Sequence, residues 1–108
     1  MNKMERDYVQ VRYSHPGEIV AAAMGELDIG VRELARAMDI APSAISRLLA
    51  KERNLSPELA IKLSVVLGST PESWMKMQIY YSLQEAEKAV DTSILRPLRT
   101  SNLLRQRP

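Results

Sequence analysis

Three polar side chains near the middle of the chain are spaced to meet a ligand from one helical face. Ser43, Ser46 and Arg47 lie in the segment PSAISRLLA, which begins with proline and carries apolar residues at Ile45 and Leu48. On a helix, the apolar residues would face inward and the hydroxyl and guanidinium groups outward. An arginine in such a place can contact guanine O6 and N7 or a phosphate. The segment therefore predicts a short helix that is presented to DNA.

A helix that reads DNA must be held by a second helix, and the preceding segment VRELARAMDIA (31–41) predicts one. Ala35 is small where the two helices approach each other. Asp39 falls at the turn, where a positive φ is expected, and a short polar side chain tolerates that φ. The expected buried residues of the pair are Leu34, Ala35, Met38, Ile40, Ile45, Leu48 and Leu49. The pattern indicates a helix-turn-helix whose second helix enters the major groove with its N-terminal end first.

The expected DNA contacts fall into two groups. Base edges would face Ser43, Ala44, Ser46 and Arg47, because small residues let the backbone approach the groove. Phosphates would be held by Arg32, Lys51 and Arg53, which position a protein without specifying sequence.

Proline followed by an acid marks several helix starts, in HPGE, SPE and TPE. Proline is tolerated at the first helical position, where its missing N–H has no partner to lose. Ser56 and Thr70 are the expected N-caps. Gly68 is expected just after the fourth helix. Five helices are predicted, at 16–27, 31–38, 42–50, 57–67 and 71–90, and strand signals are nearly absent apart from YVQVRY (8–13). The fold class is therefore all-α.

Apolar residues at helical spacing predict the faces of three of these helices. Ile19, Ala23 and Leu27 form a stripe in the first helix, and Leu59, Leu63 and Leu67 form one in the fourth. The last helix has two stripes on roughly opposite sides. Trp74, Met77 and Tyr81 are assigned to the core, and the second stripe is Met75, Ile79, Leu83, Ala86 and Val90. A helix that only capped its own domain would need one stripe, so the second is expected to form a twofold dimer interface.

Composition and charge set the remaining bounds. The 108 residues suit one domain, and the chain has no cysteine and no apolar run near the ~20 residues of a membrane span. Net charge is +2, but residues 30–54 carry +2 and residues 92–108 carry four arginines and no acid. The tail arginines Arg96, Arg99, Arg105 and Arg107 could bind phosphates or act only as a solubilising tail.

Other chemistry is not indicated. His15 is the only histidine, and no nucleophile or second ligand accompanies it, so a helix-start role is expected. Acidic residues read as solvated charges and caps in the absence of a phosphate loop. No catalytic constellation, metal site or cofactor is predicted.

Four motifs together resemble the HigA antitoxin family of the Xre/Cro-like (lambda-repressor-like) helix-turn-helix superfamily. They are HPGEIV (15–20), VRELARAMDIAPSAISRLLA (31–50), LSPELAIKLSVVLG (55–68) and TPESWMKMQIYYSL (70–83). The last, with P-x-x-W followed by M-x-M-Q-x-x-Y, is similar to this family's tryptophan–leucine–glutamine signature. Two positions depart from the family: Asp39 and Lys51 stand where glycine is usual. The departure at Lys51 leaves open whether the recognition helix continues there or ends in a strained turn.

The resemblance implies a cytoplasmic homodimer that binds a palindromic operator, represses its own operon and neutralises a RelE/HigB-like mRNA-cleaving toxin. Two alternatives remain: a stand-alone repressor without a toxin, and a protein-interaction module that does not bind DNA. The expected organisation is an extended N-terminal arm (1–13), a helix-turn-helix domain with a C-terminal dimerisation helix (14–91) and a basic tail (92–108).

Overall fold

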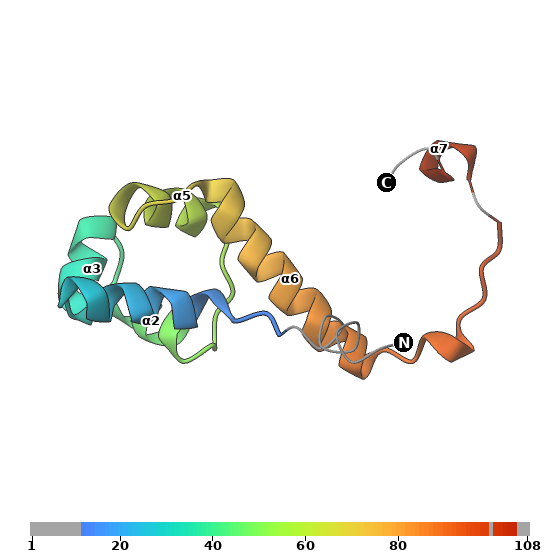
Figure 1. The fold of residues 1–108 in the computed structure, drawn as a ribbon, viewed down its shortest axis with the longest axis horizontal. Coiled ribbons are helices and arrows are strands. Elements are labelled where there is room, and N and C mark those ends of the chain that lie inside the picture. The colour runs from blue at the N-terminus through green and yellow to red at the C-terminus, as the bar shows by residue number, and fades with distance from the viewer. Residues whose placement is uncertain (1–11, 100, 106–108) are drawn as a thin grey trace, which may run out of the picture.

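The computed structural model describes residues 12–99 and 101–105, and the regular secondary structure there is entirely helical (Figure 1). The predicted all-α fold with five helices in the body is confirmed. The body comprises α2 (Pro16–Leu27), α3 (Val31–Met38), α4 (Pro42–Leu49), α5 (Pro57–Val66) and α6 (Pro71–Ala89). A 3-10 turn, η1 (Thr92–Ile94), and the short α7 (Asn102–Arg105) follow in the tail. Most of the predicted arm, including the alternating segment before Arg12, lies outside the described residues.

Each helix of the body except α3 begins at a proline, as predicted. Ser56 accepts a hydrogen bond from the backbone N–H of Leu59 at 3.2 Å. Thr70 accepts one from Ser73 at 3.1 Å. Both expected N-caps are therefore confirmed, and the hydroxyls satisfy N–H groups that the helix leaves without a partner.

Three of the helices end in the same left-handed turn. The positive-φ residues of these three turns are Asp28, Asp39 and Lys51. In each case the next N–H reaches back to a carbonyl of the last helical turn: Ile29 to Met24 at 3.0 Å, Ile40 to Ala35 at 3.0 Å and Glu52 to Arg47 at 2.9 Å. This is the Schellman arrangement, which pairs otherwise orphaned carbonyls. The positive φ expected at Asp39 is confirmed.

The core forms where α2, α3, α4, α5 and the first half of α6 meet. Its members are Val20, Met24, Leu34, Ala35, Met38, Ile45, Leu48, Leu55, Leu59, Ala60, Leu63 and Trp74, with Ile40 and Leu49 packed against it. Trp74 also donates from its indole nitrogen to the carbonyl of Gly68 at 2.9 Å. The core role predicted for the Trp74 stripe is thereby confirmed for Trp74, and Met77 also packs against the core.

The stripe expected to bury α2 is wrong. Ile19 and Leu27 are exposed, and α2 instead buries Val20 and Met24. The segment around them is apolar on more than one face, so periodicity alone does not choose between the faces. The stripe expected in α5 is confirmed, because Leu59 and Leu63 are buried and Leu67 packs beside them.

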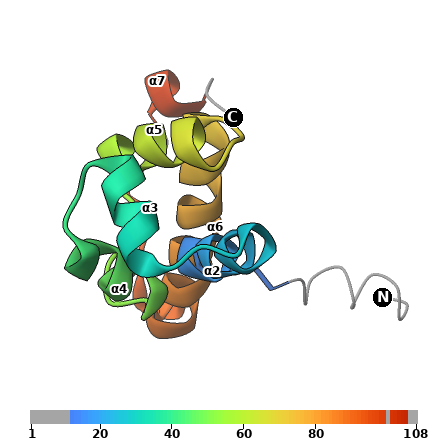
Figure 2. The same cartoon turned by 90° about the vertical axis from the view of Figure 1, so that its left-hand side faces the viewer.

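The five body helices place α3 between α4 and α5, while α6 packs on α5 and α2. Figure 2 shows α3 and α4 on the left-hand side of the body, with α2 on the right and α6 behind α2. Figure 1 shows α6 running out of the bundle and the tail continuing beyond it. The body therefore presents α4 at its surface, and the second half of α6 lies away from the core.

Candidate nucleic-acid interface

The short helix α4 is anchored by its inner face and open on its outer face. Ile45 and Leu48 are completely buried, whereas Ser43, Ser46 and Arg47 are exposed. The Arg47 guanidinium lies along the helix, and its Nε donates to the carbonyl of Ser43 at 3.4 Å. The predicted outward placement of these three polar residues is confirmed. The arginine is held toward the N-terminal end of α4, the end that would enter a groove first.

The outward placement predicted for Ala44 is wrong. Its side chain is only 7% exposed and points into the body. Residues four apart lie on the same helical face, and Ala44 precedes the buried Leu48 by four. Ala44 therefore belongs to the packing face of α4.

The predicted phosphate contacts lie on two segments that flank α4. Arg32 is exposed in the first turn of α3. Lys51 and Arg53 are exposed in the loop that follows α4, which we call the recognition loop (residues 50–55). Exposure is a property that these three residues share with other surface charges, so their contact with phosphates stays a prediction.

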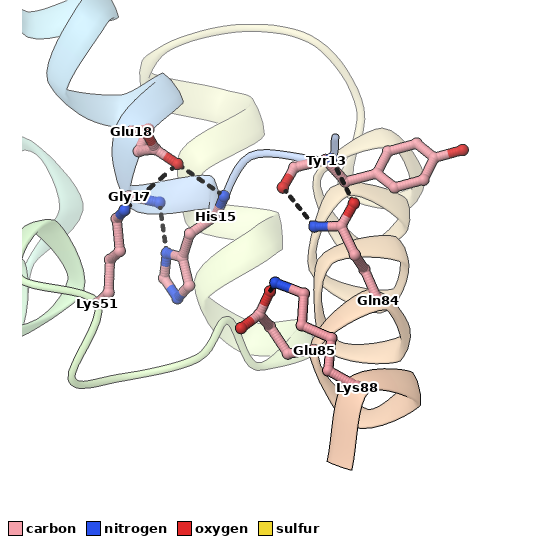
Figure 3. Close-up of polar contacts among 8 residues, drawn as sticks. All are labelled: Tyr13, His15, Gly17, Glu18, Lys51, Gln84, Glu85 and Lys88. Carbon is pink, nitrogen blue, oxygen red and sulfur yellow. Dashed lines mark hydrogen bonds and ion pairs between the residues drawn. The ribbon is translucent and has the colours of Figure 1, made fainter. Parts of the chain in front are cut away.

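The path of the recognition loop, on which the sequence allowed two alternatives, is now defined. The helix ends at Leu49, and Lys51 adopts φ 63° where glycine would be least strained. The Lys51 ammonium lies 3.5 Å from a carboxylate oxygen of Glu18 (Figure 3). Exposed pairs of this kind contribute little stability, so Lys51 can exchange Glu18 for a phosphate at small cost.

His15 takes the helix-start role predicted for it, in a form that the sequence did not specify. The ring Nδ1 of His15 accepts a hydrogen bond from the backbone N–H of Gly17 at 2.9 Å (Figure 3). The backbone N–H of His15 donates to the Glu18 carboxylate at 3.1 Å. The ring is 1% exposed and meets Tyr81 edge-on at 5.0 Å. Burial lowers the pKa of His15, and the charge of Lys51 lowers it further. Asn54, the Arg53 backbone and Glu18 raise the pKa, but by less.

Sequence reasoning missed two residues that position α4. Gly17 lies against the end of α4 so closely that a Cβ would sit 2.1 Å from the carbonyl oxygen of Leu48. Gln78 is buried in α6 and bonds to the recognition loop. Both belong to motifs that carried the family resemblance, HPGE and W-x-x-x-Q, and those motifs were the available signal.

The start of the described chain is fastened to α6. Gln84 accepts from the N–H of Tyr13 at 2.9 Å and donates to its carbonyl at 3.3 Å (Figure 3). The Tyr13 and Tyr80 rings lie 5.2 Å apart. This paired contact resembles one rung of a β-ladder, with an amide side chain in place of a strand. It directs the chain from the predicted arm into α2.

The second apolar stripe of α6 is solvent-exposed over most of its length. Ile79 and Leu83 are 48% and 54% exposed, and Ala86 is exposed as well. Val90 follows the last residue of α6 in an extended conformation and is 53% exposed. Met75 differs, because it packs against the core. The described residues contain no helix able to cross a membrane and no cluster of three potential metal ligands.

Comparison with known proteins matches this geometry to a family. Residues 20–74 match the model of the family described as Helix-turn-helix (HTH_3). The HTH-type transcriptional regulator YddM of Escherichia coli K12 is 53% identical over 88 residues, covering 82% of this chain and 94% of the relative.

Solved structures extend the likeness to antitoxins. The Pseudomonas aeruginosa antitoxin HigA with the higBA promoter superposes with a TM-score of 0.74 at 32% identity, covering 82% of this chain and all of that one. An addiction module antidote protein of the HigA family from Coxiella burnetii gives a TM-score of 0.70 at 29% identity, covering 81% and 99%.

Proposed function

Because this chain belongs to the helix-turn-helix family and is a DNA-binding regulator of HigA type, we propose that it is an antitoxin that represses its own operon. The observation that carries the proposal is the fixed outer face of α4. Arg47 and two serines stand on a helix whose opposite face is fully buried. A side chain on an anchored helix can be placed against base edges, which carry the sequence information that phosphates lack.

The proposed base contacts come from α4, and the proposed phosphate contacts come from α3 and the recognition loop. Ser43, Ser46 and Arg47 read bases from α4. Arg32 holds a phosphate from the start of α3, and Lys51 and Arg53 hold phosphates from the recognition loop. Ala44 has no direct contact with bases, because it packs inward. Binding weakens with salt in proportion to the number of phosphates neutralised.

The operator is palindromic because the protein is a homodimer. The exposed stripe formed by Ile79, Leu83, Ala86 and Val90 meets the same stripe of a second copy, and Met75 begins it at the edge of the core. The exposed Ile61 of α5 lines the same hollow as Met75 and widens the apolar surface. A twofold axis along α6 sets two α4 helices about 34 Å apart, as successive major grooves require.

The second partner is a RelE/HigB-like toxin that cleaves mRNA, bound in the cytoplasm. Support comes from the names of the structural neighbours, an addiction module antidote and an antitoxin with its promoter. In this proposal the chain is not an enzyme and uses no cofactor. It acts by binding the operator and by binding the toxin.

Two measurements test the proposal. A mobility shift on the promoter of the protein's own operon should give a salt-sensitive, sequence-specific complex that Arg47→Ala weakens. Tagged protein should also copurify with the product of the adjacent, cotranscribed gene. A shift without copurification would favour the stand-alone repressor, and copurification without a shift would favour the interaction module.

A further inference from the structure

Gln78 is a buried polar side chain that spans two parts of the fold. It lies in α6, is 5% exposed and forms three hydrogen bonds. Its Oε1 accepts from the backbone N–H of Leu55 at 2.7 Å. Its Nε2 donates to Asn54 Oδ1 at 3.2 Å and to Ser82 Oγ at 2.9 Å. Both amide hydrogens are used, so the side chain has one defined orientation.

Two of these bonds hold the recognition loop. The loop is secured at its start by the left-handed turn at Lys51, where Glu52 bonds back to Arg47 at 2.9 Å. At its end Leu55 is buried and its N–H is bound by Gln78. Residues 51–54 between these anchors are all exposed. Within the described residues, Gln78 is the polar link from α6 to this exposed span.

The loop also rests on a buried ring. His15 is 1% exposed, and its pKa responds to Asn54, to Lys51 and to the Arg53 backbone, so the imidazole lies beneath the same span. Its Nε2 is buried without a hydrogen-bond partner. The hydrogen bonds that reach Leu55 and Asn54 from another helix come from Gln78.

We propose that Gln78 is a positioning residue for DNA binding. From α6 it fixes the recognition loop so that Lys51 and Arg53 stand ready at two phosphates beside the groove that α4 enters. The inference rests on the phosphate contacts proposed above and adds what holds them in place. A loop already ordered in the free protein loses less conformational freedom on binding, so its contacts contribute more affinity.

Because Gln78 lies on α6, its hydrogen bonds also link the recognition loop to the proposed dimer interface. Gln78 immediately precedes Ile79 of the exposed stripe, and Ser82 immediately precedes Leu83. The helix that forms the dimer therefore carries the anchor of the recognition loop on an adjacent face. Pairing two copies fixes α6, and the loop of each copy is fixed with it.

The experiment compares Gln78→Glu with Ser82→Ala. Gln78→Glu keeps an oxygen that can accept from Leu55 but removes the donor to Asn54. Ser82→Ala is the matched control, because it removes a bond to Gln78 that stays within α6. We measure operator affinity against salt concentration for both variants, with circular dichroism melts to confirm folding.

Gln78→Glu should weaken operator binding about fivefold at fixed salt, the effect of one net hydrogen bond. It should also reduce the slope of log affinity against log salt by about one for each phosphate that the loop no longer binds. Ser82→Ala should leave the slope unchanged. If Gln78→Glu does not fold, Asn54→Ala removes the same bond at its exposed end and should give the same change in slope.

A double-mutant cycle separates positioning from a general loss of stability. Arg53→Ala should reduce the slope in the wild-type background and have little further effect in Gln78→Glu. Arg32→Ala, on α3, should have its full effect in both backgrounds. A wild-type slope in folded Gln78→Glu, or an undiminished effect of Arg53→Ala there, overturns the proposal.

The cycle also separates this inference from the proposed function. If Arg53→Ala and Lys51→Ala leave the slope unchanged in the wild-type background while Arg47→Ala still weakens binding, the positioning role is overturned and recognition by α4 stands. If Arg47→Ala has no effect either, both the inference and the proposed DNA contacts fail.

Discussion

The chain has two basic regions, and the structure gives them opposite settings. The region around α4 carries a net charge of +2 over residues 30–54, and the tail carries +4 over residues 92–108. Yet α4 stands on two fully buried residues, Ile45 and Leu48, whereas every described residue of the tail is exposed, up to 95% at Leu98. The larger charge is therefore on the less supported segment. Recognition of a DNA sequence requires side chains that are held in place against the bases. The two basic regions therefore differ less in their charge than in how firmly the rest of the fold holds them.

The largest effect should follow from disturbing the anchor of α4. In Gly17→Ala the new Cβ would lie 2.1 Å from the backbone oxygen of Leu48, and a backbone atom cannot swing aside. We expect a loss of about 3 kcal/mol in the free energy of unfolding, measured by urea denaturation.

Gly25→Ala is the matched control for this prediction. It lies in the same helix, and its Cβ would meet nothing within 4 Å. It should gain about 0.5–1 kcal/mol, because alanine is the better helix former. Equal stability of the two variants would show that the start of α2 does not contact the end of α4 as closely as the structure indicates.

The next effect concerns the proposed dimer, in which α4 would be present twice on one operator. Ile79→Asp combined with Leu83→Asp places two charges on the exposed stripe of α6. We expect a folded monomer by sedimentation and circular dichroism, with operator binding weakened about a hundredfold or more, because one half-site is lost.

The matched control places the same charges on the tail. Ile94→Asp with Leu95→Asp alters residues at least as exposed, at 74% and 60%. This variant should remain a dimer. A dimeric Ile79→Asp, Leu83→Asp variant with native helicity would move the interface elsewhere.

The third prediction compares a fixed arginine with a tail arginine. Arg47→Ala should weaken specific binding by about 1–3 kcal/mol and reduce the ratio of specific to non-specific affinity. If the tail binds phosphates, Arg96→Ala should lower both affinities together, since an exposed tail charge carries no sequence information; if it does not, both affinities should stay unchanged. Wild-type affinity in a folded Arg47→Ala variant would contradict the role of α4.

The sequence predicted those features whose causes are local. Prolines and capping hydroxyls fix helix starts within a few residues, and so Pro42, Ser56 and Thr70 were correctly placed. The left-handed turn at Asp39 was predicted for the same reason.

The errors arose where tertiary packing decides. Ile19 and Val20 are both apolar neighbours on α2, and only contact with other helices selects Val20 for the core. Ala44 is small enough for either face of α4. Gln78 bonds to a residue 23 positions away, and no spacing in the sequence shows such a bond. Gly17 and Gln78, which act across the fold, were therefore missed, whereas the buried Ile45 and Leu48 and the outward placement of the polar residues on α4 were predicted.

The fourth prediction uses the buried ring under the recognition loop. Burial holds the pKa of His15 below its ordinary value of 6.5, so the unfolded chain binds a proton more readily than the folded one. The free energy of unfolding therefore rises with pH between the two pKa values. Stability should be full above about pH 6.5, fall as the pH drops below that value and level off below the folded pKa.

Urea denaturation from about pH 5 to 8, the range in which histidine titrates, measures this dependence. His15 is the only histidine, so His15→Asn tests its origin. Asparagine is also a good N-cap and does not titrate, so the variant should lose the dependence near pH 6.5 even though it loses packing. The same pH dependence in both proteins would assign it to another group.

The smallest effect is expected from the tail, and it bears most directly on the contrast between the two basic regions. Deleting residues 92–108 removes four arginines and no acid. If the tail binds phosphates, the slope of log affinity against log salt should fall by about one for each phosphate that it neutralised. Because no described residue of the tail is buried, the ratio of specific to non-specific affinity should stay unchanged. A changed ratio would mean that the tail becomes ordered on the operator and reads sequence. An unchanged slope would assign the tail to solubility or to a protein partner, and its exposed Ile94, Leu98 and Leu103 would then be the residues to test for that contact.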